Sequence, residues 1–278
     1  ADAAREYFAK HHQDEKIIWM EPSELAAKDT AFEPAVKRNL IAGAVMGVTD
    51  ESGDARIFAT KLATEFENRG GEIRTNCRVT DFISQNGYVQ GVTTEQGDIS
   101  ADRVVLSSGV ASKALAKKIG ITIPVLPIKG YSVTVPIIDE RRVPISSCTD
   151  LKHRLVISRL GMRLRVAGFA EIGSDKACDA GRAAAARDRL EALFPDAADY
   201  QSFDNWMGFR PMTPDGAPII GEAETMRNLW FNTGHGTLGW TLSHGTAQLL
   251  TDMMAGRKTA LDMKPYKIKR SYVSGIFG

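Results

Sequence analysis

Apolar residues recur at every fourth position between Asp54 and Arg69, and this spacing predicts an amphipathic helix. Asp54 can cap the start of this helix through its side-chain oxygens, and Gly70-Gly71 can end it. A second run, Arg182–Phe194, is rich in alanine with spaced leucines and predicts a surface helix. The repeated residues of the first run are Phe58, Leu62 and Phe66.

After Gly71 the apolar spacing shortens, and brief runs rich in isoleucine and valine predict strands. The turn signals Asn86-Gly87 and Gln96-Gly97 separate some of these runs. A strand, a small antiparallel meander and a further strand should therefore follow the first helix. The predicted strands are Glu72–Thr75, Arg78–Ile83, Tyr88–Thr94 and Arg103–Ser107.

The remaining chain predicts a mixture of helices and strands. Helices are expected at residues 110–120 and from Trp240 to Ala255, and helical pieces within residues 1–40. One of these pieces should start near Glu21, with Pro22 in its first turn and Ser23 as its cap. Residues 40–49 suit a buried strand or a tight turn, and the tail after Gly256 should be irregular. Further strands are expected at Tyr131–Pro136, Leu155–Ile157, Leu164–Ala167 and Leu229–Thr233.

Composition narrows the class of protein. The 278 residues are 43% hydrophobic and 25% charged, as in ordinary globular domains. The chain has 35 Lys and Arg residues and 34 Asp and Glu residues. It therefore lacks the excess of positive charge that is typical of nucleic-acid-binding proteins. The three cysteines form no CxxC motif, which predicts neither a zinc site nor a disulfide framework. The chain has no apolar run of transmembrane length and no signal-peptide core, and these features favour a cytoplasmic protein.

Residues 234–239 match the pattern G-x-G-x-x-G between a predicted strand and a predicted helix. A dinucleotide fingerprint also needs a second parallel strand that ends in an acidic residue about 20 residues on. That strand is missing, because the chain soon ends in coil with lysines and prolines. Two interpretations remain besides an independent dinucleotide site. The glycines let the backbone approach a flat cofactor, or they allow close packing of helix on strand without a ligand.

An arginine precedes proline in the stretch Gly208–Gly221, which holds three prolines and predicts a rigid loop. The backbone of Arg210 should be extended because Pro211 follows it. A guanidinium on a stiff backbone suits a carboxylate, which it binds through two parallel hydrogen bonds. The alternative is a structural arginine that binds loop carbonyls or Asp215.

These two blocks resemble the C-terminal signature of the FAD-dependent D-amino-acid dehydrogenases, in the D-amino-acid oxidase-like superfamily. The first block runs from Gly208 to Gly221 and the second from Asn228 to Thr241. Supporting likenesses lie at Asp50–Asp54, Val104–Gly109 and Pro127–Pro136. The resemblance covers residues 17–270.

The resemblance implies a flavoprotein that removes a hydride from the α-carbon of an amino acid and yields a 2-oxo acid and ammonia. Arg210 would bind the substrate carboxylate and Tyr131 would line the substrate cavity. The loop from Gly234 would lie beside the pyrimidine end of the flavin. His235 and His244 receive no role as a catalytic base, and Lys129 stays unassigned. The FAD-binding residues implied are Val79, Ser108, Gly109, Gly234, His235, Gly236, Thr237, Leu238, Gly239, Trp240 and Thr241.

The implied fold is α/β. Residues 48–110 and 207–270 would form an incomplete Rossmann-like FAD-binding domain with a β-meander. Residues 1–47 and 111–206 would form a substrate-binding domain with a mixed sheet. The family opens with a dinucleotide-binding βαβ segment that this sequence does not contain. We therefore expect a partner chain or segment to complete the FAD site.

Three functions stay open at this stage. The first is D-amino-acid oxidation, with electrons passing to an acceptor such as a quinone at the inner membrane, where the protein would be peripheral. The second is oxidation of a related amine such as glycine, sarcosine or proline, and an oxidase would use oxygen. The third is a non-catalytic subunit that keeps the fold for assembly.

Overall fold

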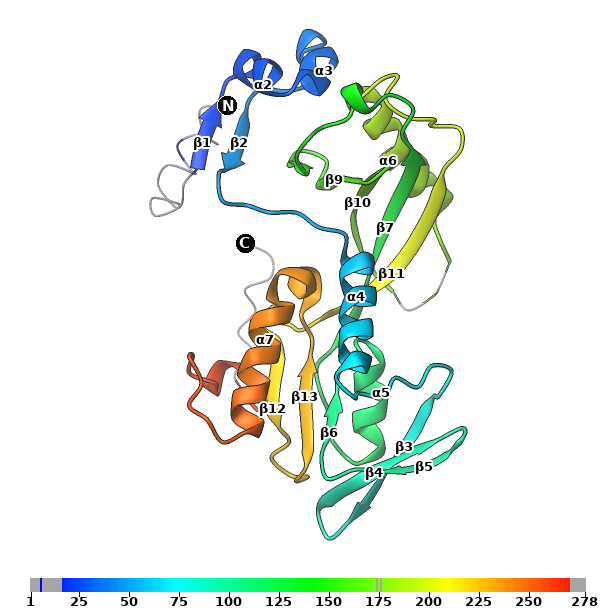
Figure 1. The fold of residues 1–278 in the computed structure, drawn as a ribbon, viewed down its shortest axis with the longest axis vertical. Helices are drawn as coiled ribbons and strands as arrows, with labels where there is room; N and C mark the ends of the chain where they lie inside the picture. Colours follow the sequence, from blue (N-terminus) through cyan, green and yellow to red (C-terminus); the bar gives the residue numbers. More distant parts are fainter. Residues whose placement is uncertain (1–5, 7–16, 174, 176, 271–278) are drawn as a thin grey trace. The chain divides into compact units, whose positions relative to one another are not determined.

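The computed structural model describes residues 6, 17–173, 175 and 177–270 (Figure 1). The chain forms two compact units. The first unit comprises Ala1–Phe58, Gly130–Ala170 and Asp175–Gly208. The second comprises Ala59–Lys129, Glu171–Ser174 and Phe209–Gly278, and thus includes residues 111–129, which the sequence analysis placed in the substrate domain. Which unit holds a cofactor or a substrate stays a prediction.

The first unit begins with a two-stranded antiparallel sheet of β1 (Ile17–Met20) and β2 (Ala44–Gly47). Between them lie α2 (Pro22–Lys28), a 3-10 turn η1 (Thr30–Phe32) and α3 (Glu33–Lys37). The expected helical start is confirmed, but the predicted cap is wrong. Glu21, not Ser23, precedes the helix, and its backbone N–H donates to the Glu24 carboxylate at 2.8 Å.

A five-stranded sheet lies mostly in the first unit, in the order β11-β7-β10-β9-β8. Its core face packs against α6 (Ala180–Leu193), whose buried residues include Leu190 and Leu193. Val133 of β7 and Val166 of β10 belong to the same apolar cluster. The strands are β7 (Leu126–Pro136), β8 (Cys148–Asp150), β9 (Leu155–Leu160), β10 (Arg163–Ile172) and β11 (Asp204–Met212).

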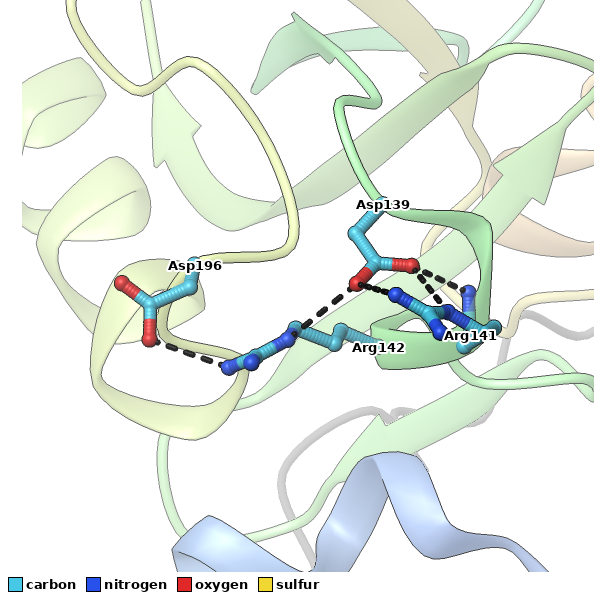
Figure 2. Close-up of polar contacts among 4 residues, drawn as sticks. All are labelled: Asp139, Arg141, Arg142 and Asp196. Carbon is cyan, nitrogen blue, oxygen red and sulfur yellow. Dashed lines mark hydrogen bonds and ion pairs between the residues drawn. The ribbon is translucent and has the colours of Figure 1, made fainter.

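Charged side chains fix the loop that follows β7. Figure 2 shows Asp139 at the start of the 3-10 turn η2 (Glu140–Arg142), where its carboxylate accepts from Arg141 and Arg142 at 3.0–3.3 Å. Arg142 also donates to Asp196 in the turn after α6, at 3.1 Å. The pKa of Asp139 falls to about 2, chiefly through the hydrogen bond from the Arg141 side chain. These exposed pairs tie two loops of the first unit together.

The second unit contains a three-stranded sheet in the order β12-β13-β6, in which β13 runs parallel to β6. Helix α5 (Ala111–Lys118) packs on one face of this sheet, with Phe231 in the shared core. Helix α7 (Gly239–Met254) packs on the other, against Trp230, in front of β12 and β13 in Figure 1. The strands are β6 (Val104–Leu106), β12 (Ile219–Glu222) and β13 (Leu229–Thr233).

The predicted meander is confirmed as an antiparallel sheet of β3 (Val79–Gln85), β4 (Tyr88–Thr94) and β5 (Gly97–Ser100). The strand predicted at Glu72–Thr75 is wrong, because this stretch is not a strand and lies in none of the sheets. It has strand-like composition but no neighbouring strand among the described residues. Composition alone does not supply the hydrogen-bonding partner that a strand requires.

The first predicted helix is confirmed as α4 (Ala55–Asn68), with the Asp54 carboxylate accepting from the N–H groups of Arg56 and Ile57 at 2.9 and 3.1 Å. No residue of α4 is buried. Its apolar stripe is instead half exposed, in the residues Phe58 at 48%, Leu62 at 56% and Phe66 at 51%.

The rigid loop predicted for residues 208–221 is partly wrong, because Gly208–Met212 belongs to β11 and Ile219–Gly221 to β12. Pro211 is compatible with β11 because that strand lies at the edge of its sheet, the position in a sheet at which proline is tolerated. Residues 213–218 form the actual turn.

Candidate functional site

The carboxyl ends of β6 and β13 lie side by side because these strands are parallel neighbours. A buried hydroxyl relay joins the loops that follow them. Ser112 Oγ donates to Thr233 Oγ1 at 3.2 Å, and Thr233 Oγ1 donates to the carbonyl of Gly109 at 3.3 Å. Ser112 is 0% and Thr233 is 2% exposed, so solvent does not compete for these bonds. Neither residue can be identified from the sequence alone, because small hydroxyl side chains carry no motif of their own.

The glycine loop after β13 has backbone angles that only glycine adopts without strain at two positions. Gly234 has φ 80° and Gly236 has φ 55°. A Cβ atom on Gly234 would lie 2.9 Å from the Thr213 methyl group, and one on Gly236 would lie 2.5 Å from Met212 Sδ. Gly239 differs, since it is the first helical residue of α7 and its Cβ would make only an ordinary contact at 3.6 Å.

The loop leads through a 3-10 turn, η3 (Gly236–Leu238), directly into the N-terminus of α7. No side chain in the described chain caps this end. The first N–H groups of a helix lack partners within the helix and carry its positive end charge, so they attract electron-rich groups. The outer side chains of the loop are open to solvent. They are those of Thr237, Leu238, Trp240 and Thr241.

The side chain of His235 points to α7, where its Nε2 lies 3.1 Å from Thr246 Oγ1. Burial lowers the pKa of His235, which favours the neutral ring. The Thr246 hydroxyl also donates to the Ser243 carbonyl at 3.2 Å. The histidine therefore anchors the loop to its helix through a side chain. His244 lies one turn into α7 and is exposed.

Arg210 lies on β11, and this strand continues into contact with the glycine loop through a bridge between Met212 and His235. Arg210 is partly buried, and burial lowers the pKa of its guanidinium, which nevertheless stays protonated at any ordinary pH. Asp215 is the alternative, structural partner for Arg210. That carboxylate is bound by Arg270 through two hydrogen bonds of 2.7 and 2.9 Å.

Arg270 holds the whole turn that follows β11. It also donates to the carbonyls of Ala217 and Pro218 at 2.6 and 3.2 Å, and its side chain is 6% exposed. Thr213 Oγ1 closes the same turn by donating to Ala217 O at 2.7 Å. The hydrogen bond from Arg270 is the main cause that lowers the pKa of Asp215. A partner 55 residues away cannot be read from the local sequence.

The other predicted residues have local contacts of their own. Val79 is the first residue of β3 and pairs with Thr94 in the meander. Tyr131 belongs to the first unit, is 2% exposed, and packs edge-on against Phe169 at 6.1 Å. Lys129 is 2% exposed and forms an ion pair with Glu171 at 3.1 Å. The cavity role of Tyr131 and the adenine role of Val79 stay predictions.

Two further features bear on the chemistry. Within residues 17–173 and 177–270, His, Cys, Asp and Glu side chains form no group of three or more that could hold a metal ion. Among the helices of the described chain, none combines the length and apolar character needed to cross a membrane.

Parallel strands that end in glycine-containing loops beside a helix N-terminus define an α/β protein of the cofactor-binding class, in which the ligand lies at the carboxyl ends of the strands. The profile of one family, described as FAD dependent oxidoreductase (DAO), matches residues 1–253. The chain therefore belongs to this family, as the sequence resemblance predicted, and its α/β fold class is confirmed.

Curated relatives carry the name D-amino acid dehydrogenase. The chain is 42% identical over 247 residues to that of Paramagnetospirillum magneticum, which covers 88% of this chain and 58% of the relative. It is 41% identical to that of Granulibacter bethesdensis, covering 80% of this chain and 53% of the relative. The chain thus spans between half and three-fifths of the length of these relatives.

Solved structures share the fold. Glycine oxidase from Geobacillus kaustophilus superposes with a TM-score of 0.83 at 25% identity, covering 97% of this chain and 71% of the other. L-proline dehydrogenase from P. horikoshii superposes with a TM-score of 0.79 at 18% identity, covering 91% and 68%. The second likeness concerns the fold alone.

Proposed function

We propose that this chain is the major part of an FAD-dependent enzyme that oxidises D-amino acids to 2-oxo acids and ammonia. The names of relatives at about 40% identity support the substrate class. The observation that carries the proposal is the packing of the glycine loop against the end of β11, the strand that bears Arg210. This packing holds the glycine loop, which could bind a cofactor, next to the strand whose Arg210 could bind a carboxylate.

The described residues fit a flavin. Gly109 has a positive φ angle and no atom within 4 Å of the position that a Cβ would take, so the backbone there is open for close approach. The uncapped start of α7 offers N–H groups. The segment Gly234–Thr241 would contact the pyrimidine end, while Ser108 and Gly109 would lie near the phosphates. FAD, when bound, accepts the hydride released from the substrate α-carbon. The N–H groups at α7 would stabilise the negative charge that reduction brings.

Arg210 binds the substrate carboxylate in this proposal. Partial burial reduces competition from water and strengthens charge-assisted hydrogen bonds to a carboxylate. A fixed carboxylate leaves the α-carbon with few positions, so Arg210 orients the bond that must break. No protein base is assigned to the amine proton, which water accepts.

A second candidate function is the oxidation of glycine or a related small amine. The likeness to the glycine oxidase from Geobacillus kaustophilus favours it. Both candidates need the same carboxylate clamp and differ in the space left for a side chain. A panel of D-amino acids, glycine, sarcosine and proline, assayed with the flavin-loaded protein, separates them.

We also propose that a further polypeptide segment completes the FAD site, either in the same chain or in a partner. Two surfaces support this. The apolar face of α4 is about half exposed, and β6 is the last strand of its sheet, with Val105 40% exposed. Open strand edges and contiguous apolar faces are usually covered by protein. A non-catalytic subunit would instead bind no flavin even with that segment present.

The electron acceptor follows from the dehydrogenase proposal. A quinone at the inner membrane would accept the electrons, and the protein would contact that membrane from its surface. Oxygen consumption by the reduced protein would favour an oxidase instead.

The central test measures flavin absorption and D-amino-acid turnover in the assembled protein, with Arg210→Ala and, as its control, Arg141→Ala on the surface. We expect kcat/KM to fall by about a hundred-fold in the first, since a charged hydrogen-bond pair is lost, and to stay unchanged in the second. Unchanged kinetics in Arg210→Ala would refute the carboxylate role. Absence of bound flavin in the assembled protein would refute the proposed enzymatic function.

A further inference from the structure

Three side chains from neighbouring strands meet within the first unit, on the face of the sheet away from Val133 and Val166. Arg165 of β10 donates from Nη2 to Ser132 Oγ of β7 at 3.1 Å. Its guanidinium carbon lies 5.8 Å from the ring centroid of Trp206 of β11. Ser132 is 3% exposed, whereas Trp206 is 59% exposed. The arginine is thus held by a buried hydroxyl and lies against an indole that solvent reaches.

Arg165 has no acidic partner within ion-pair distance in the described part of the chain, although it is partly buried. Its neighbours in the same sheet differ. Arg163 pairs with Asp54 at 3.3 Å, and Arg159 pairs with Glu140. A partly buried guanidinium without an acidic partner has N–H groups that remain available and are only partly hydrated. Such a group favours the binding of an anion.

A hollow of about 410 Å³ lies on the same three strands, lined in part by Thr134, Arg163 and Asp204. Each of these residues is two positions along its strand from Ser132, Arg165 or Trp206, and alternate residues of a strand share a face. The hollow therefore continues the surface on which Arg165 lies.

We propose that Arg165, Ser132 and Trp206 form a binding site for a small carboxylate with a flat or apolar body. The guanidinium binds the carboxylate with the donors that Ser132 leaves free, and the indole face contacts the body of the ligand. Asp204 in the hollow repels a second carboxylate. The ligand is a monocarboxylate other than the substrate held by Arg210.

Fluorine NMR with 4-fluorophenylacetate as the probe tests the site. The test is made in an Arg210→Met background, so that the proposed substrate clamp does not contribute. We expect saturable binding in Arg210→Met and at least about ten-fold weaker binding when Arg165→Met is added. Arg141→Met is the matched control, because Arg141 is an exposed arginine of the same unit that is paired with Asp139. Binding that survives Arg165→Met unchanged would overturn the proposal.

Two additions keep the test independent of folding. Circular dichroism and thermal unfolding verify that each variant keeps its structure, and Arg165→Lys, which keeps the charge, should retain part of the binding. Trp206→Leu should weaken binding of the probe, because the aromatic contact is lost, while the melting temperature stays near that of the parent. Equal probe affinity in Trp206→Leu and the parent would show that the Trp206 indole does not contact the ligand.

Discussion

Gly236 lies against the sulfur atom of Met212, and a Cβ atom at position 236 would come within 2.5 Å of it. The contact joins the glycine loop to the strand that carries Arg210. Because the φ angle of Gly236 is 55°, any side chain there would be strained as well as crowded.

Gly236→Ala should therefore lower the free energy of unfolding by about 1–3 kcal/mol, the usual range for a strained backbone position. Gly239→Ala is the matched control, because Gly239 has helical angles at the start of α7 and room for a methyl group. Urea unfolding of the chain without added flavin measures both. Equal losses in the two variants would contradict the role assigned to Met212.

Asp215→Asn should destabilise the protein at neutral pH by about 1.5–3 kcal/mol, since it removes the carboxylate that Arg270 binds. The folded-state pKa of Asp215 is lowered, so the unfolded chain takes up the proton first as pH falls. The stabilisation is fully present above the ordinary aspartate pKa, near 3.9, and is lost progressively as pH falls from there through the lowered folded-state pKa. The difference in melting temperature between the two proteins should therefore be constant near pH 7 and shrink as pH falls below about 4. Asp188→Asn, at an exposed pair, should show no such gap.

Thr233→Val should lower the free energy of unfolding by about 1 kcal/mol, because it removes one hydroxyl from the relay between Ser112 and Gly109. Thr233→Ser keeps the hydroxyl and should restore that part of the loss. Guanidinium unfolding measures stability, and a titration with FAD reports whether the two loops still present their backbone groups. A serine variant that is no better than the valine variant would rule out the hydrogen bonds as the cause.

The cysteines should differ sharply in reactivity. Burial raises the pKa of the Cys148 thiol to about 12, with the carboxylates of Asp29 and Asp150 adding to the effect, whereas Cys178 is exposed. Only the thiolate reacts with alkylating reagents, so iodoacetamide at pH 8 should modify Cys178 and spare Cys148 until the protein unfolds. Peptide mass spectrometry reads both sites in one sample. Rapid modification of native Cys148 would show that its strand opens.

Periodicity predicted the elements whose contacts are local. The helix capped by Asp54, the meander, and the strand and helix around Gly234 all follow from spacing and turn residues. Apart from the helix cap, which is Glu21 and not Ser23, the errors came where a distant partner decides the structure. Glu72–Thr75 has the composition of a strand without a neighbour to pair with, and Pro211 sits in a strand because β7 pairs with only one edge of β11.

The candidate site divides in the same way. The glycines and Arg210 have recognisable motifs, and the side chains that hold them do not. Ser112 and Thr233 are 121 residues apart in the sequence and meet only in the folded unit. Arg165 was missed because its significance lies in the absence of an acidic partner within the described chain, which no sequence pattern records.

The position of Arg270 in the sequence affects when the turn at Asp215 can fold during synthesis. The turn at Asp215 gains its two charged hydrogen bonds only after a residue 55 positions later has left the ribosome. Domains generally fold as units during synthesis, and this turn belongs to a unit in which Arg270 is translated after the strand and the turn that it holds. A nascent chain stalled before Arg270 would therefore lack the hydrogen bonds that hold the turn after the Arg210 strand. We expect proteases to cut this turn faster in the stalled chain than in the chain that contains Arg270.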